Sequence, residues 1–297
     1  MSETAVVTGG LGRAGRWVVD AFAERGYETV CVDLDHPGWE ISPRENVDFR
    51  AADLADAAEA FDLFADLDPD AVAHLAALPS PTRHAGNEVF ATNTESTYNV
   101  LTAAGRAGAR IAWASSESAY GFPFAREQTL PDELPITEDH ELRPEDPYGL
   151  SKVVGEETAA RTARRYDVPV VSVRPSWVQH PGDYNCTGNR DDLAAGAGNF
   201  WSYVDARDLA SLFVAAVEPD AVTGHEAVNG VAAENYVGRP TADVVAEFFG
   251  GLPADCALEG EQSALSPAKA RRLLDWEPEH TWRDAADADV EAPTLYE

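Results

Sequence analysis

Short apolar runs alternate with longer amphipathic stretches along the first 175 residues of the chain. The runs are continuously apolar, as is typical of strands that are buried on both faces of a parallel sheet. They predict six strands, at residues 4–8, 28–33, 47–49, 71–75, 109–115 and 168–173. The stretches between them predict helices, at residues 16–26, 53–67, 89–107 and 145–166. This alternation predicts an α/β fold, a Rossmann-like doubly wound parallel sheet.

The pattern breaks after Pro175. Residues 176–199 are rich in Gly, Asn and Asp and predict a loop. A helix is expected to begin near Asp205, and a strand at 225–229 and short helices at 241–249 and 266–274 follow. We therefore expect a Rossmann core of residues 1–175, continued by about 203–230, and a small C-terminal lobe of residues 176–202 and 231–297 laid over one end of the sheet.

Acidic residues outnumber basic ones by 52 to 22, which gives a net charge of −30. They are scattered along the chain, which indicates an acidic surface on a folded body rather than a disordered tail. Repulsion from phosphates argues against nucleic acid as a partner. The chain holds only two lysines, Lys152 and Lys269, and this acidic, lysine-poor composition resembles that of proteins from extreme halophiles.

Membrane and metal chemistry find no support in the sequence. No apolar run approaches the roughly 18–20 residues that span a bilayer, and the N-terminus carries no basic leader, so we expect a cytoplasmic protein with no membrane partner. The three cysteines show no CxxC spacing and the seven histidines no HExxH, so we expect no metal site.

A glycine-rich turn follows the first predicted strand, in the sequence TGGLGRAG. Gly9 permits a tight turn, Gly12 lets backbone amides approach a pyrophosphate, and Gly15 lets the next helix pack closely. The helix N-terminus then favours an anion. Asp33 closes the second strand, where a carboxylate can bind both ribose hydroxyls and repel a 2′-phosphate.

These features predict a bound dinucleotide. NAD is favoured, and NADP is not excluded because Arg13 and His36 can lie near the same phosphate. The small C-terminal lobe is then expected to bind the substrate.

Tyr148 and Lys152 lie four residues apart in the predicted helix that precedes the sixth strand, so their side chains share a face. A free tyrosine has a pKa near about 10, and a neighbouring ammonium stabilises its phenolate. The pair therefore predicts a general acid/base with a helper. Ser116, at the end of the fifth strand, can hold a substrate oxygen opposite Tyr148.

The motifs TGGxGxxG, HLAA, ASSxxxYG, YxxxK, RP and YVDxxDLA stand in the order typical of one family. From about residue 4 to 276 the chain resembles the extended short-chain dehydrogenase/reductase family, the NAD-dependent epimerase/dehydratase group. The resemblance implies a homo-oligomer, a dimer or tetramer. It also implies that Asn93 is a structural and proton-relay residue. Further cofactor contacts are implied for Asp53 and Leu54 at the adenine, Leu75, Ala76 and Ala77 along the cofactor, and Pro175 and Ser176 at the nicotinamide.

Within this family the chain looks most like aldose and uronate 1-dehydrogenases, which share YGLSKxxGE and FWSYVDARDLA. The resemblance implies oxidation of a sugar at C1 to a lactone, with Tyr148 taking the O1 proton. Uronate dehydrogenation and nucleotide-sugar 4-epimerisation with tightly held NAD are the alternatives, and a non-catalytic NAD(P) sensor is a remote one. Candidate substrate contacts, besides Ser116 and Tyr148, are Ser80, Glu117, Trp177, His180, Arg190, Asn199 and Trp201.

The segment 176–202 bears on substrate size, because nucleotide-sugar members of the family use it to grip the nucleotide. Here it is short and rich in Gly and Asn. Its only Arg or Lys is Arg190, against three aspartates, so a diphosphate would be poorly paired. A free monosaccharide is therefore favoured. Arg190 leaves a uronate open, but the acidity of the segment favours a neutral aldose such as arabinose, galactose or glucose.

Overall fold

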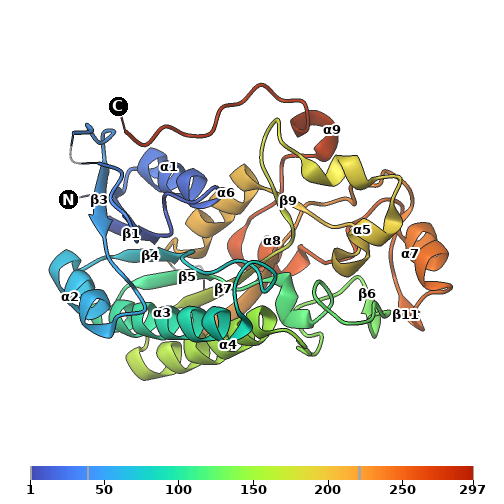
Figure 1. The fold of residues 1–297 in the computed structure, drawn as a ribbon, viewed down its shortest axis with the longest axis horizontal. Helices are drawn as coiled ribbons and strands as arrows, with labels where there is room; N and C mark the ends of the chain where they lie inside the picture. The colour runs from blue at the N-terminus through green and yellow to red at the C-terminus, as the bar shows by residue number, and fades with distance from the viewer. Residues whose placement is uncertain (1, 39, 220–221, 297) are drawn as a thin grey trace.

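Seven parallel strands form the central sheet in the computed structural model, which describes residues 2–38, 40–219 and 222–296. Their order is β10-β7-β5-β4-β1-β2-β3, so the chain runs outward from β1 to one edge and then crosses to the other. Figure 1 shows this sheet between two layers of helices. The strands are β1 (Thr4–Thr8), β2 (Glu28–Asp33), β3 (Val47–Ala51), β4 (Ala71–His74), β5 (Arg110–Ala114), β7 (Val170–Pro175) and β10 (His225–Gly230).

Each face of the sheet is covered by its own helices. On one face α1 (Gly15–Arg25) packs against α6 (Ala206–Ala216), and both contribute to an apolar core with alternate residues of the strands. On the other face lie α2 (Ala57–Leu67), α3 (Gly86–Ala107) and α4 (Pro147–Tyr166). Burial on both faces explains why the strands are continuously apolar.

Helix α4 begins where its sequence dictates. The Asp146 side chain accepts hydrogen bonds from the backbone amides of Tyr148 and Gly149, at 2.8 and 2.9 Å, and Pro147 occupies the first turn, where its missing N–H costs nothing. The helix ends at Asp167, which is left-handed with a φ of 57°. The N-terminal cap thus fixes the turn that carries Tyr148.

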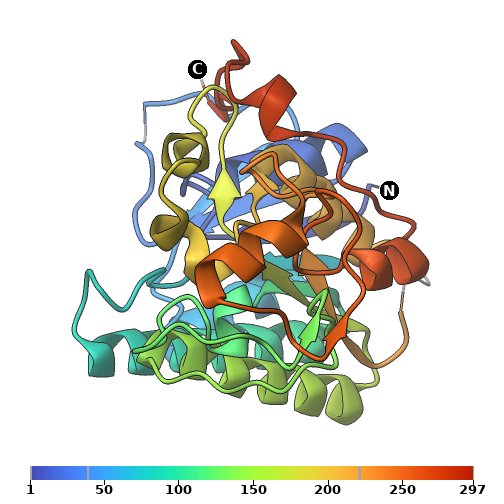
Figure 2. The ribbon, with the colours of Figure 1, turned by 90° about the vertical axis from the view of Figure 1, so that its right-hand side faces the viewer.

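A third apolar cluster lies beyond the carboxyl ends of the strands, at the right of Figure 1 and facing the viewer in Figure 2. It joins residues from about 120–136, 184–203 and 231–286, with Phe200, Tyr203 and Tyr236 at most 1% exposed. Its elements are β6 (Glu133–Leu134), η2 (Asn185–Asn189), α5 (Leu193–Gly196), η3 (Ala197–Asn199), α7 (Thr241–Phe249), β11 (Asp255–Cys256) and α9 (Trp282–Ala285). Three further elements, β8 (Val178–Gln179), β9 (Val204–Asp205) and α8 (Ala268–Leu274), pack with the core beneath α1 and α6 instead. The division into a core and a substrate lobe stays a prediction.

The predicted α/β sheet is confirmed, with strand and helix ends shifted by a few residues. The prediction of a continuous loop at 176–199 is wrong. That segment holds β8, two 3₁₀ turns and α5, because the buried residues Tyr184 and Cys186 anchor it to the third cluster. Among the described residues, no helix is both long and apolar enough to cross a membrane.

Candidate active site

A cavity of about 520 Å³ opens where β5 and β7 end and α4 begins. The turn η1 (Glu117–Tyr120) forms one side of it, directly after β5. The cavity brings together residues from segments far apart in the sequence, as expected at the carboxyl edge of a parallel sheet. Its lining residues are Pro79, Ser116, Glu117, Ser118, Pro123, Phe124, Gln128, Tyr148, Pro175, Ser176, Trp177, Val178, Ala194, Ala195, Gly198 and Asn199.

Ser116 and Tyr148 face each other in this cavity. The Ser116 hydroxyl caps η1 by accepting from the Ser118 amide at 3.0 Å, and its proximity to the Tyr148 phenol favours the phenolate by lowering the pKa of that group. Burial opposes this effect and raises the pKa of Tyr148 to about 12. The phenol therefore needs positive charge nearby before it can serve as a base.

Lys152 supplies one such charge from the next turn of α4. Its Nζ lies 5.3 Å from the centre of the Tyr148 ring and donates to the Ala114 carbonyl at 2.8 Å. Burial lowers the pKa of Lys152 to about 7. The carbonyl at the end of β5 thus fixes the ammonium beside the ring instead of at the phenol oxygen.

Two contacts hold α4 close to β5. A Cβ added at Gly155 would lie 2.4 Å from Cη2 of Trp113, so only glycine leaves room for this indole. One residue on, the Glu156 carboxylate accepts from Ser115 Oγ at 2.6 Å and from both Nε and Nη2 of Arg174. The buried Glu156–Arg174 pair thus joins α4 to β7, and Ser115 ties both to the residue that follows β5.

Glu117 places a carboxyl group in the cavity wall, and only 7% of the residue is exposed. Its Oε2 accepts from the Ser176 hydroxyl at 2.7 Å. Burial, partly offset by this bond, raises the pKa of Glu117 to about 8.

The glycine-rich turn has the geometry of a phosphate-binding loop. Gly9 is left-handed, with a φ of 67°, and a Cβ there would lie 2.8 Å from the Ala76 amide nitrogen. A Cβ at Gly15 would lie 2.0 Å from the Gly9 carbonyl, so α1 can begin at this turn only with glycine. Gly10, which the sequence analysis passed over, is equally constrained by Cys31 beneath it. These crowded glycines fit a dinucleotide turn.

Asp33 lies beside this turn. Its two oxygens accept from the backbone amides of Leu11, at 3.0 Å, and Leu34, at 2.9 Å. Gly12 bonds to Gly9 within the turn, and Arg13 forms an ion pair with Asp183 of the segment after β7. The carboxylate thus sets the shape of the loop in addition to any contact with a ribose.

The remaining predicted cofactor residues lie along the same edge. Leu75 and Ala76 donate their amides to Thr8, and Ala77 is half-buried beside them. Asn93 exchanges two hydrogen bonds with the backbone of Leu78 and donates to Ser151 at 3.3 Å, so it is placed for a structural role. Asp53 is exposed, Leu54 is buried in the core, and Pro175 and Ser176 line the cavity.

The model of the NAD dependent epimerase/dehydratase family matches residues 5–229. The chain belongs to this family. It is 32% identical to a UDP-glucose 4-epimerase of Streptococcus mutans over 174 residues, 57% of this chain and 50% of that protein. It is also 32% identical to the L-arabinose 1-dehydrogenase (NAD(P)(+)) of Haloferax volcanii over 183 residues, 58% of this chain and 66% of that one. The chain thus matches no more than two thirds of either relative's length.

Solved structures of this family share the whole fold. A short-chain dehydrogenase/reductase superfamily protein from Agrobacterium tumefaciens, solved with bound NAD, is 25% identical, with a TM-score of 0.70 over 95% of this chain and 94% of that one. The predicted membership of the extended short-chain dehydrogenase/reductases is thereby confirmed. The chain is a member of a family of NAD-dependent, sugar-modifying enzymes.

Among the predicted substrate contacts of this family member, Glu117, Trp177 and Asn199 line the cavity. Ser80 is not in the lining, and its hydroxyl is hydrogen-bonded to that of Thr82. His180 is also outside the lining, and its backbone forms an isolated β-bridge with Asp183. Burial and the Arg13 charge lower the pKa of His180.

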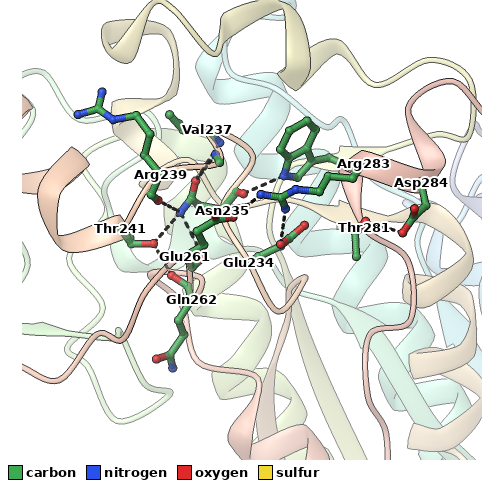
Figure 3. Close-up of polar contacts among 12 residues, drawn as sticks. Glu234, Asn235, Val237, Arg239, Thr241, Glu261, Gln262, Thr281, Arg283 and Asp284 are labelled. Atoms are coloured by element: carbon green, nitrogen blue, oxygen red, sulfur yellow. Dashed lines mark hydrogen bonds and ion pairs between the residues drawn. The ribbon is translucent and has the colours of Figure 1, made fainter.

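Arg190 and Trp201 are not brought to the cavity. The Arg190 guanidinium donates to the Val237 carbonyl and lies 4.0 Å from the ring centre of Trp282. Asn235 fixes the loop that contains Val237, because its side-chain amide donates hydrogen bonds to the Thr241 hydroxyl and the Glu261 carbonyl (Figure 3). Trp201 is fully buried and donates to the Leu193 carbonyl. Both serve the packing of the third cluster.

One wall of the cavity was not predicted from the sequence. Pro123, Phe124 and Gln128 line it, and Phe124 meets the Tyr148 ring edge-on at 6.2 Å. The one signal in the sequence is the apolar GFPF stretch directly after the ASSxxxY motif, which has no helical or strand period. Gly198 packs against Pro123 from the other side, so this wall forms only through tertiary contacts.

Proposed function

We propose that the protein is an NAD(P)-dependent sugar 1-dehydrogenase, which oxidises a free monosaccharide at C1 to the aldonolactone. One observation carries the proposal: Ser116 and Tyr148 open onto a cavity whose lining, within the described residues, includes no Arg, Lys or His. A volume of about 520 Å³ suits a small ligand beside a nicotinamide ring. Hydroxyl groups can be bound there, whereas phosphates would lack counter-charges.

The geometry supports a proton transfer at O1. Ser116 holds the O1 hydroxyl, and Tyr148 takes its proton as the C1–O1 bond becomes a carbonyl. NAD, when bound, supplies the acceptor for the C1 hydride. The Lys152 ammonium stabilises the phenolate, and the phenolate in turn favours the ammonium, so the raised pKa of Tyr148 and the lowered pKa of Lys152 both move back as the pair ionises.

The cofactor would lie along the carboxyl edge of the sheet. Backbone amides of the turn at Gly9, Gly12 and Gly15 would bind its pyrophosphate, and Pro175 and Ser176 would face the nicotinamide. Asp33 would bind the ribose and favours NAD. Arg13 is already paired with Asp183, which supports the same choice, because this cation is engaged elsewhere.

Nucleotide-sugar 4-epimerisation is the second candidate, favoured by the likeness to the Streptococcus mutans protein. The absence of Arg, Lys and His from the described lining of the cavity speaks against it, and so does the hydrogen bond of Arg190 to the Val237 carbonyl. The same engagement removes the reason for favouring a uronate, since Arg190 was its only candidate partner. The Ser116, Tyr148 and Lys152 constellation opposes a purely regulatory role.

A substrate panel separates these activities. Free arabinose, galactose, glucose and galacturonate are each added with NAD or NADP in molar KCl, and absorbance of the reduced cofactor is followed. UDP-glucose and UDP-galactose are tested in parallel for interconversion. We expect reduced cofactor with a neutral aldose. Interconversion of the UDP-sugars with no cofactor reduction by any free sugar would establish the epimerase instead.

A further inference from the structure

Glu117 is the one acidic side chain in the lining of the active-site cavity within the described residues. It stands directly between Ser116, which faces Tyr148, and Ser118, and the turn η1 fixes its backbone. The Ser176 hydroxyl holds its Oε2 at 2.7 Å. The carboxyl group is therefore positioned at the place where a sugar would meet Ser116.

The groups that face Glu117 bring it no positive charge. Ser176 approaches from the end of β7, Tyr148 from α4, and Tyr236 from the third cluster. A tyrosine is either neutral or negatively charged, so neither ring can supply a counter-charge to a carboxylate. A carboxylate enclosed by neutral groups is costly, and the group keeps its proton instead. The raised pKa of Glu117 agrees with this geometry.

Asn199 provides a second, independent sign of a polar ligand. The residue lines the same cavity, and its Oδ1 is buried with no hydrogen-bond partner among the described residues. A buried acceptor of this kind calls for a donor, because an unmade hydrogen bond is costly. A sugar hydroxyl can donate to Asn199 and accept from a neutral carboxyl group.

We propose that Glu117 determines substrate specificity: as a neutral acid it donates a hydrogen bond to a sugar hydroxyl, while Asn199 accepts one, so that the site takes neutral aldoses and rejects uronates. The inference rests on the proposed function. A uronate would bury its own carboxylate beside Glu117 with no cation in the lining. Ionisation of Glu117 at alkaline pH removes the donated hydrogen bond, so aldose binding weakens there.

The test compares Glu117→Ala with the isosteric Glu117→Gln, whose amide keeps a donor and an acceptor for Ser176. With arabinose at pH 6.5, we expect Glu117→Ala to raise KM at least about tenfold, because one hydrogen bond to the sugar is lost. In Glu117→Gln, KM should return most of the way to the wild-type value. Wild-type kcat/KM should fall above about pH 8, and this fall should vanish in Glu117→Gln. Exposed Glu157→Gln on α4 is the control and keeps wild-type behaviour.

Two further readouts separate this inference from the proposed function. Calorimetry measures arabinose and galacturonate binding to the enzyme–NADH complex, and infrared spectroscopy follows a carboxylic-acid band that titrates in wild type but not in Glu117→Gln. Three results would overturn the inference and leave the proposed function standing, provided that sugar is still oxidised. The first is a fall of kcat/KM at alkaline pH that persists in Glu117→Gln, and the second is the absence of the titrating carboxylic-acid band in wild type. The third is galacturonate binding as tightly as arabinose. If no free sugar is bound or oxidised, the proposed function fails and the specificity role with it, while the band still reports the proton on Glu117.

Discussion

Burial disfavours the charged form of both Tyr148 and Lys152. Burial raises the pKa of the phenol to about 12 and lowers the pKa of the ammonium to about 7. Each residue alone is thus poorly suited to charge at neutral pH, and the pair is useful only because each stabilises the ionised state of the other. We therefore expect chemistry at this site to depend on two neighbouring side chains, not on one unusual side chain.

Replacing Tyr148 by Phe should abolish sugar oxidation while NADH binding stays within about threefold, because only the hydroxyl that transfers the proton is lost. Steady-state rates and fluorescence titration of NADH check the two expectations. Tyr98→Phe, on the exposed part of α3, serves as the control and should change neither. Retention of more than about a tenth of wild-type turnover by Tyr148→Phe would disprove the assigned role.

Glu117 should make stability depend on pH. Its pKa is raised from 4.5 to about 8, so between these values the native state holds a proton that the unfolded chain has released. Stability is therefore lost as pH rises through this window, by up to about 5 kcal/mol. Glu117→Gln does not ionise, so its Tm advantage over wild type should grow from pH 5 to pH 8 and then level off. Thermal unfolding in molar KCl measures this.

The control for this effect is the exposed Glu157, whose replacement by Gln should leave the pH dependence of Tm unchanged. Parallel Tm curves for wild type and Glu117→Gln across pH 5–8 would show that Glu117 is ionised in the folded protein.

At the scale of elements, the β1–α1 turn and β2 act as one unit. The Asp33 carboxylate at the end of β2 accepts from the Leu11 amide within the turn, and Gly9 donates its amide to the Val32 carbonyl. A dinucleotide bound there meets a loop whose shape is already set. We therefore expect cofactor preference to depend on β2 as well as on the glycines.

Asp33→Asn should shift preference toward NADP. The substitution removes the charge that repels a 2′-phosphate and keeps one acceptor for the backbone amides. We expect the ratio of kcat/KM for NADP to that for NAD to rise at least about tenfold, equivalent to about 1.4 kcal/mol. Asp62→Asn, exposed on α2, is the matched control. An unchanged ratio would place the 2′-hydroxyl away from Asp33.

Elements with their own period were predictable from the sequence, and elements held only by distant partners were not. Strands β1, β2, β4, β5 and β7 appeared as apolar runs, and the spacing of Tyr148 and Lys152 fixed them on one helical face. The two-residue strands β6 and β11 pair across more than a hundred residues and leave no pattern in the chain. Arg190 and Trp201 were misplaced for the same reason. The guanidinium of Arg190 bonds to the Val237 carbonyl, and the indole of Trp201 packs against Phe248 and Phe249 of α7.

At the scale of the molecule, charge is the dominant feature. The net charge is −30, and many ion pairs are exposed, such as Arg13 with Asp183, at 64% and 54% side-chain exposure. Exposed pairs of this kind contribute little. Repulsion among the unpaired carboxylates therefore outweighs them in dilute buffer and is screened when the Debye length falls to about 3 Å at 1 M salt.

We expect Tm to rise continuously from 0.05 M toward molar KCl, and activity to rise with it, since screening removes repulsion that the folded state concentrates. Calorimetric scans over a salt series test this, with sorbitol of equal osmolality as the control for general solvent exclusion. A Tm that is flat or falls with KCl would contradict the expectation, and an equal rise in sorbitol would assign it to solvent exclusion.

The contact between Gly155 and Trp113 also has an evolutionary consequence. The indole occupies the space that any side chain at position 155 would need, so neither residue can change first without a clash or a void. A descendant sequence that loses glycine at position 155 should therefore also carry a smaller residue at position 113. Related sequences that act on different substrates should still keep this pair. The contact sets how close the helix with Tyr148 and Lys152 lies to the sheet, and it does not shape the sugar pocket.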